Sequence, residues 1–215
     1  KHVAKLLDYV AHSPASNKTI IAITSDHGDA FGEHGYINHG QDLHRELLHV
    51  PLIIYVPNIE PRNIPGAVSP IDLFPTLADL IGADTSDLNI EGESLVPQLF
   101  YGEDAHNRIV FAETNYPKPL RAVINSRYKL ILDMKNNVSR LWDLRKDPLE
   151  KKNIWTKDKE GYKEMRAYLN EWIERVVYAR DVESNQAMAK LADHLVAKRP
   201  EGAIAVEGLS ADEGN

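Results

Sequence analysis

The residues best suited to chemistry lie between Ser25 and Gly40, directly after a short apolar run. Asp26 and His27 follow the run Ile20–Thr24, which is too short and unbroken for an amphipathic helix and is typical of a strand buried on both faces. Ligands of open α/β sheets collect beyond the carboxyl ends of the strands. A carboxylate beside an imidazole suits divalent metal ions, so this pair is a candidate metal site.

More titratable side chains follow on the same loop. They are Asp29, Glu33, His34 and His39, placed among Gly28, Gly32, Gly35 and Gly40. An isolated Asp-His-Gly is also typical of a simple turn, in which Asp bonds its own backbone and Gly takes a positive φ. The concentration of titratable groups on flexible backbone favours a binding site over a simple turn.

The composition is that of an ordinary soluble globular protein. The chain has 215 residues, 43% of them hydrophobic and 27% charged, which is enough for a substantial core. The net charge of -7 argues against general nucleic-acid binding, so an anionic substrate would need positive charge from a metal or a few cations. The absence of cysteine excludes disulfides and thiolate chemistry within the chain. No apolar run approaches the roughly 20 residues of a membrane helix, and the first residues do not resemble a signal peptide.

The elements expected before residue 105 belong to a mainly parallel α/β sheet. Apolar spacing predicts a helix that ends before Ser13-Pro14, and the run 52–56 predicts a second buried strand. A further helix is expected to end at Gly82, with Asp72 capping its start. A helix, a short loop and a buried strand form half of a crossover unit.

The pattern changes after residue 105. The β-type runs 109–113, 120–125, 128–132 and 140–144 predict an antiparallel sheet, and the apolar spacing over 162–176 predicts a helix. We therefore expect three parts: residues 1–105 as part of an α/β domain, 106–180 as a small antiparallel subdomain with its helix, and 181–215 as a helical segment with an acidic flexible tail.

Several segments in a fixed order resemble the sulfatases of the alkaline phosphatase superfamily. They are DHGDAFGEHGYINHG, VPLIIYVP, VSPIDLFPTLADLIG, EGESLVPQL and a C-terminal pattern made by Asp143, Leu144, Asp147, Pro148, Glu150 and Asn153. The resemblance covers about residues 1–155. It implies that residues 1–105 are the C-terminal part of an alkaline-phosphatase-like catalytic domain, followed by the small antiparallel sheet packed with a C-terminal helix.

The resemblance also implies roles for the loop residues. Asp26 and His27 match the late pair of metal ligands. Many sulfatases have Asn at the position of His27 and bind calcium. A His at this position resembles the phosphonate and phosphodiester hydrolases, which favour Mn, Zn or Mg. His39 matches a Lys that contacts the sulfate oxygens, so it is a candidate substrate-binding and catalytic residue that could protonate the leaving oxygen. Glu33 and His34 are expected to shape the loop or support the metal ligands.

The same resemblance implies that part of the site lies upstream of Lys1. Sulfatases use a formylglycine made within a Cys/Ser-x-Pro-x-Arg motif and an early Asp-Asp pair, and neither motif occurs here. We expect metal-dependent hydrolysis of a small-molecule or glycan sulfate ester by an intact protein, of which this chain is the C-terminal half, inactive alone. Phosphodiester or phosphonate hydrolysis, phosphoglycerol transfer, and a non-catalytic binding module stay open, as does a homo-oligomer.

Overall fold

The computed structural model describes residues 1–177 and 186. The helical segment and acidic tail expected over residues 181–215 lie outside the described residues, apart from residue 186. The chain divides into two units, Lys1–Asn170 and Glu171–Asn215, and the first holds all the strands described below. The domain boundaries expected at residues 105 and 180 stay predictions. In the described part of the chain, every helix is too short or too polar to cross a bilayer.

The first unit begins with a helix and a two-stranded sheet. Its elements are α1 (His2–Ala11), the 3-10 turn η1 (Ser16–Lys18), β1 (Ile21–Thr24) and β4 (Leu52–Tyr55). The expected strands are present, but they pair antiparallel, with Ile21 opposite Tyr55 and Thr24 opposite Leu52. Burial on both faces was a wrong prediction for this chain, because β1 and β4 pair only with each other among the described strands and Ile53 is 57% exposed.

The site loop and the helices that follow are mostly short elements. They are β2 (Ala30–Phe31), β3 (Ile37–Asn38), α2 (Arg45–Leu48), the 3-10 turn η2 (Pro70–Asp72), α3 (Leu73–Ile81) and α4 (Val96–Tyr101). The β2–β3 hairpin was not predicted. Asp72 caps the 3-10 turn η2 that leads into α3, because its carboxylate accepts the Ser69 backbone N–H at 2.8 Å. It occupies the N-cap position of α3 but makes no side-chain cap bond to that helix. Gly82 ends α3 with a left-handed φ of 68°, as expected.

The antiparallel sheet after residue 105 is confirmed. Its strands are β5 (Val110–Thr114), β6 (Leu120–Ile124), β7 (Tyr128–Asp133) and β8 (Val138–Asp143), and they are neighbours in chain order. Each pair is antiparallel, so alternate residues of each strand point to opposite faces.

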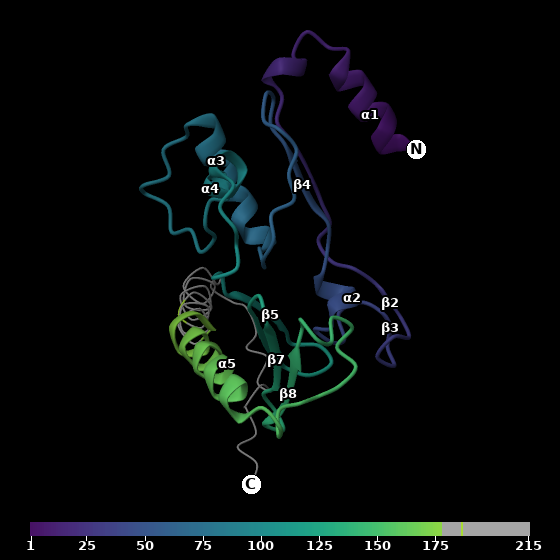
Figure 1. The fold of residues 1–215 in the computed structure, drawn as a ribbon, viewed down its shortest axis with the longest axis vertical. Helices are drawn as coiled ribbons and strands as arrows, with labels where there is room; N and C mark the ends of the chain where they lie inside the picture. The colour runs from purple at the N-terminus through teal and green to yellow at the C-terminus, as the bar shows by residue number, and fades with distance from the viewer. Residues whose placement is uncertain (178–185, 187–215) are drawn as a thin grey trace, which may run out of the picture. The chain divides into compact units, whose positions relative to one another are not determined.

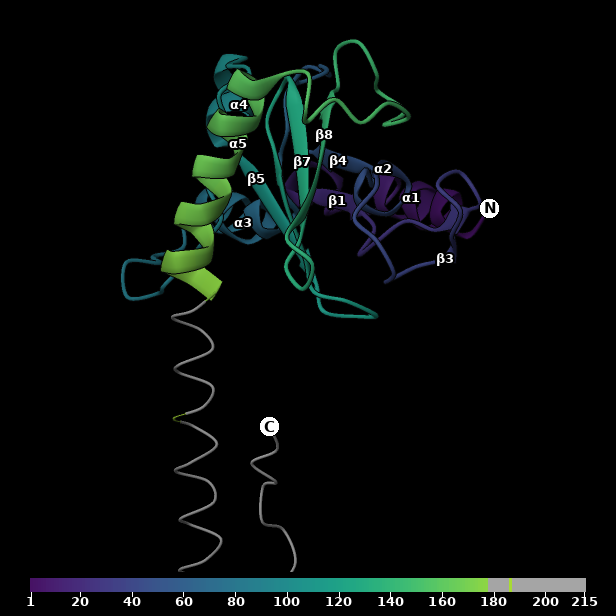
Figure 2. The same ribbon diagram turned by 90° about the horizontal axis from the view of Figure 1, so that it is seen from below.

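One face of this sheet packs against α5 (Lys159–Trp172), which continues into a π-helical turn, η3 (Ile173–Val177). Figures 1 and 2 show α5 alongside the sheet. Tyr162 and Ser139 share a hydrogen bond of 3.3 Å. Gly161 lies against the Tyr128 ring, where an added Cβ would come 2.7 Å from a ring carbon. A side chain at residue 161 would therefore push the helix off the sheet.

The opposite face of the sheet receives the segment that follows the glycine-rich loop. Leu43 is buried with Leu120, Ala122, Ile131 and Trp142 in one cluster. Asp42 beside it accepts a bidentate ion pair from Arg140, with the shortest N–O distance at 3.0 Å. Burial alone would raise the pKa of Asp42, but the hydrogen bonds and charge of Arg140 lower it. The segment is thus fixed to the sheet by apolar and ionic contacts together.

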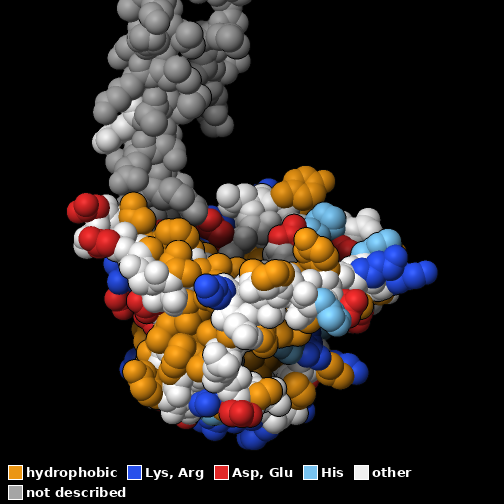
Figure 3. Space-filling view, turned by 90° about the horizontal axis from the view of Figure 1, so that it is seen from above, with side chains coloured by type: hydrophobic (Ala, Val, Ile, Leu, Met, Phe, Trp, Pro, Cys, Tyr) orange, Lys and Arg blue, Asp and Glu red, His pale blue; other side chains and the backbone are white. Residues whose placement is uncertain are grey.

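Apolar surface is extensive elsewhere. Hydrophobic side chains cover much of the face seen in Figure 3. Tyr55 of β4 and Phe74 of α3 are 49% and 55% exposed. Patches of this kind commonly mark surfaces that other protein covers.

Replacing Lys129 with Ala tests the buried contact between β7 and the segment after β8 that carries Glu150. The Lys129 ammonium lies 2.8 Å from the Glu150 carboxylate, and both side chains are 2% exposed. Removing one partner leaves a buried charge, so the free energy of unfolding should fall by about 3–5 kcal/mol in urea titrations of the full-length protein. The control Lys118→Ala removes a half-exposed partner of Asp133 and should cost less than about 1 kcal/mol. Equal losses in the two variants would contradict this account.

Candidate metal and substrate site

Asp26 and His27 lie side by side just after the end of β1. The Asp26 Oδ2 atom is 3.6 Å from His27 Nε2, and the side chains are 86% and 42% exposed. The Asp26 carboxylate also accepts the His27 backbone N–H at 3.0 Å, and this bond is the main cause that lowers the pKa of Asp26. The carboxylate is therefore charged at neutral pH, and both groups are open to solvent.

The His27 ring has a defined orientation. Its Nδ1 lies 2.9 Å from the Gly28 carbonyl oxygen, which can only accept a hydrogen bond. The Nδ1 atom must therefore carry the proton, which leaves the Nε2 lone pair directed to the side where Asp26 lies. A backbone carbonyl behind a histidine is a common way to present the other ring nitrogen to a metal. The donor types and their placement fit one side of a divalent metal site.

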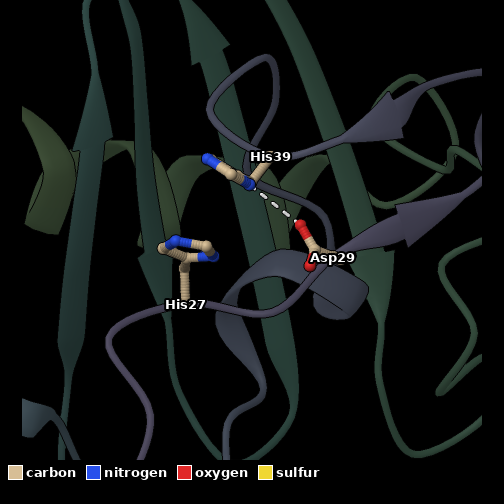
Figure 4. Close-up of side chains that lie close together, drawn as sticks. All are labelled: His27, Asp29 and His39. Atoms are coloured by element: carbon tan, nitrogen blue, oxygen red, sulfur yellow. Dashed lines mark hydrogen bonds and ion pairs between the residues drawn. The ribbon is translucent and has the colours of Figure 1, made fainter.

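The His39 side chain lies beside that of His27, from the other end of the loop (Figure 4). The two ring centroids are 4.1 Å apart, with the planes tilted by 30°. The Asp29 Oδ1 atom lies 2.9 Å from His39 Nδ1. Potential ligand atoms of His27, Asp29 and His39 all lie within 4.8 Å of one another. The role of Asp29 was not predicted from the sequence, because its contact with His39 depends on the β2–β3 hairpin, which has no clear sequence signal.

Gly28 connects the site to α2. Its N–H donates to the Leu47 carbonyl oxygen at 2.9 Å, and an added Cβ would collide with the Glu46 carbonyl. Close packing against a helix therefore requires glycine at residue 28. At the other end of α2, the Arg45 N–H donates to Glu150 Oε2 at 3.1 Å. The site is thereby linked through α2 to the residue that pairs with Lys129.

Glu33 and His34, the predicted supporting residues, make different contacts. Glu33 shapes the loop, since its carboxylate accepts the Phe31 N–H at 2.6 Å. His34 lies 2.8 Å from the Glu46 carboxylate and 3.2 Å from the Glu150 carbonyl oxygen. The contacts of His34 connect the loop to α2 and to the segment after β8, and none of these contacts reaches Asp26 or His27. A supporting role for Glu33 and His34 toward the metal ligands stays a prediction.

A second group of potential ligands consists of His34, His44 and Glu46. The two imidazoles are stacked, with centroids 3.8 Å apart and planes 10° apart. A ring nitrogen binds a metal through a lone pair in the plane of the ring, so parallel stacked rings cannot both direct lone pairs at one ion. The Arg140 guanidinium, 3.3 Å from His44 Nε2, adds positive charge. This group is better suited to packing than to metal binding.

His49, at the end of α2, also contacts protein. Its Nδ1 lies 2.9 Å from Arg45 Nη2. That contact spans α2 and is separate from the Asp26–His27 pair.

Comparisons with known proteins agree on one family. Residues 1–83 match the family model Sulfatase. The chain is 33% identical over 189 residues to a Delta 4,5-hexuronate-2-O-sulfatase of Bacteroides thetaiotaomicron, covering 81% of this chain and 39% of that protein. It is 32% identical over 157 residues to a choline-sulfatase of Rhizobium meliloti, covering 71% of this chain and 30% of that protein. The chain thus spans well under half the length of these relatives.

Solved structures extend the likeness to the fold. A 2-O GAG sulfatase superposes with a TM-score of 0.71 at 32% identity, covering 80% of this chain and 40% of that chain. A phosphonate monoester hydrolase of Agrobacterium radiobacter superposes with a TM-score of 0.60 at 24% identity, covering 86% of this chain and 38% of that chain. The second likeness concerns the fold alone.

The buried His44 predicts a loss of stability in mild acid. Burial lowers the pKa of His44 to about 4, with Lys129 and Arg140 adding to the effect and Asp42 opposing it. An unfolded histidine titrates near pH 6.5, so the unfolded state takes up the proton first as pH falls, and stability should decline between about pH 6.5 and 4. His44→Asn should flatten this part of the profile of unfolding free energy against pH. Parallel profiles for the two proteins would contradict the assignment.

Metal binding predicts a shift in melting temperature. Mn²⁺, Ca²⁺ or Zn²⁺ added at about 100 times the dissociation constant should stabilise the full-length protein by about 2.7 kcal/mol. Asp26→Ala and His27→Ala should each reduce this stabilisation. Asp8→Ala, which removes an exposed carboxylate of α1, should not. An unchanged melting shift in both site variants would exclude the pair as ligands.

Proposed function

We propose, because this chain belongs to the sulfatase family of the alkaline phosphatase superfamily, that the whole protein hydrolyses sulfate esters. One observation supports the proposal above the others. The charged Asp26 carboxylate lies beside His27 Nε2, the ring nitrogen that is left without a proton. Sulfated saccharides are the proposed substrates, since one relative acts on a hexuronate 2-O-sulfate by its name.

Asp26 and His27 are the proposed metal ligands of this chain. When bound, a divalent ion would supply the positive charge that polarises the sulfate oxygens and activates the nucleophile. An oxygen and an imidazole nitrogen leave Ca, Mn, Mg and Zn as candidate ions. A competent site needs more than two protein ligands, and we propose that the remaining ligands and a formylglycine nucleophile come from the rest of the protein.

His39 is the proposed residue that contacts the anion and the leaving group. Its ring faces that of His27 with a tilt of only 30°, so both imidazoles cannot direct in-plane lone pairs at one ion as they stand. This geometry favours a role for His39 apart from metal binding. Asp29 accepts from Nδ1 and leaves Nε2 for the substrate. As an imidazolium, with both ring nitrogens protonated, His39 would donate from Nε2 a hydrogen bond to the sulfate or a proton to the departing oxygen. It would keep the Nδ1 proton bonded to Asp29.

Hydrolysis of phosphonate or phosphodiester substrates is the second candidate. The observation that favours it is His27, in a place where the sulfatase resemblance more often has Asn. Purified full-length protein should be assayed with a sulfated monosaccharide, 4-nitrophenyl sulfate and 4-nitrophenyl phenylphosphonate. Preference for the sulfates by kcat/KM supports the first function, whereas preference for the phosphonate replaces it with the second.

His39→Ala should lower kcat on a sulfate ester by about 100-fold, since the loss of a general acid or anion contact commonly costs this much. Metal content, measured by plasma mass spectrometry, should be retained. His12→Ala, which removes an exposed histidine at the end of α1, is the matched control and should keep full turnover. Unchanged turnover in His39→Ala would discard the role, and loss of the metal would reassign His39 as a ligand.

A further inference from the structure

The loop 115–119 between β5 and β6 lies next to the His39 segment. The Thr114 hydroxyl, at the end of β5, donates to the Gly40 carbonyl oxygen at 3.1 Å. Gly40 follows His39 directly in the chain. The same hydroxyl accepts the Tyr116 N–H at 3.3 Å. Two hydrogen bonds therefore connect the backbone of Tyr116 to the residue after His39.

The other end of the loop is fixed as well. Thr114 pairs with Leu120 across the sheet, which closes the loop at its base. The Met134 N–H donates to the Pro119 carbonyl oxygen at 2.9 Å, and the Lys118 ammonium lies 3.4 Å from the Asp133 carboxylate. Contacts at both ends restrict the loop. The loop would therefore lose little additional conformational entropy when it binds a ligand.

Tyr116 stands exposed on this anchored loop. Its side chain is 74% exposed, although burial of a tyrosine ring is favourable. Asn115 and Lys118 lie close to Tyr116 in the chain, and the Lys118 ammonium is held by Asp133. An exposed aromatic face suits the apolar C–H face of a sugar ring.

We propose that Tyr116 determines specificity by stacking on the sugar ring that carries the sulfate while His39 contacts the sulfate. The inference rests on the proposed function, because it names the part of the substrate beyond the reacting group. Tyr116 acts in binding only and takes part in no bond-breaking step. Its removal should therefore act on KM for ring-bearing substrates and leave kcat nearly unchanged.

The test compares Tyr116→Ala, Tyr116→Phe and Tyr101→Ala in the full-length protein. Each is assayed on a sulfated monosaccharide and on a short alkyl sulfate without a ring. Tyr116→Ala should raise KM for the sulfated sugar about 3- to 10-fold, with little change on the alkyl sulfate. Tyr116→Phe keeps the ring and should restore KM. Tyr101, on α4 and 78% exposed, is the matched control and should behave as the unsubstituted protein.

The test distinguishes a failure of the Tyr116 inference from a failure of the proposed function. If the unsubstituted protein hydrolyses the sugar sulfate and Tyr116→Ala matches it on both substrates, the role of Tyr116 is overturned and the proposed function stands. An equal loss on both substrates would also overturn it, because a structural defect does not depend on the ring. If the unsubstituted protein hydrolyses neither sulfate, both the proposed function and this inference fall.

Discussion

The buried ion pair between Lys129 and Glu150 is the contact on which the site depends. Burial lowers the pKa of Lys129, and the charge and hydrogen bonds of Glu150 oppose that shift, so each group needs the other. Glu150 also accepts the first N–H of α2 at 3.1 Å and holds His34 through its own carbonyl. Its φ of 56° is unfavourable for a residue with a side chain, and its contacts on several sides hold it there.

A series of hydrogen bonds connects this ion pair to Asp26 and His27, the proposed metal ligands. The sheet holds α2 through Glu150 and Leu43, α2 receives the N–H of Gly28, and Gly28 fixes the tautomer of His27 through its carbonyl. Asp26 and His27 are thus exposed but not loosely placed. Ligands held in this way need little rearrangement to bind an ion or a substrate. Through the ion pair of Lys129 on β7 with Glu150, the small antiparallel sheet is connected to the loop that carries Asp26 and His27.

The sequence predicted what depends on local pattern. Alternating residues located β5 to β8, Gly82 marked the end of α3, and Asp72 was identified as a cap. It did not predict the β2–β3 hairpin, whose two-residue strands have no recognisable period. The contact of Asp29 with His39 followed from that hairpin and was missed with it. The burial of β1 was overestimated. An apolar run indicates that a strand can be buried, but it does not show which part of the chain packs against it.

The central claim is that Asp26 and His27 bind the same divalent ion. Anomalous diffraction from crystals of the full-length protein grown with Mn²⁺ tests it most directly. We expect an anomalous peak about 2.0–2.4 Å from both an Asp26 carboxylate oxygen and His27 Nε2. A fully occupied peak elsewhere, with both side chains more than about 4 Å from any ion, would contradict it.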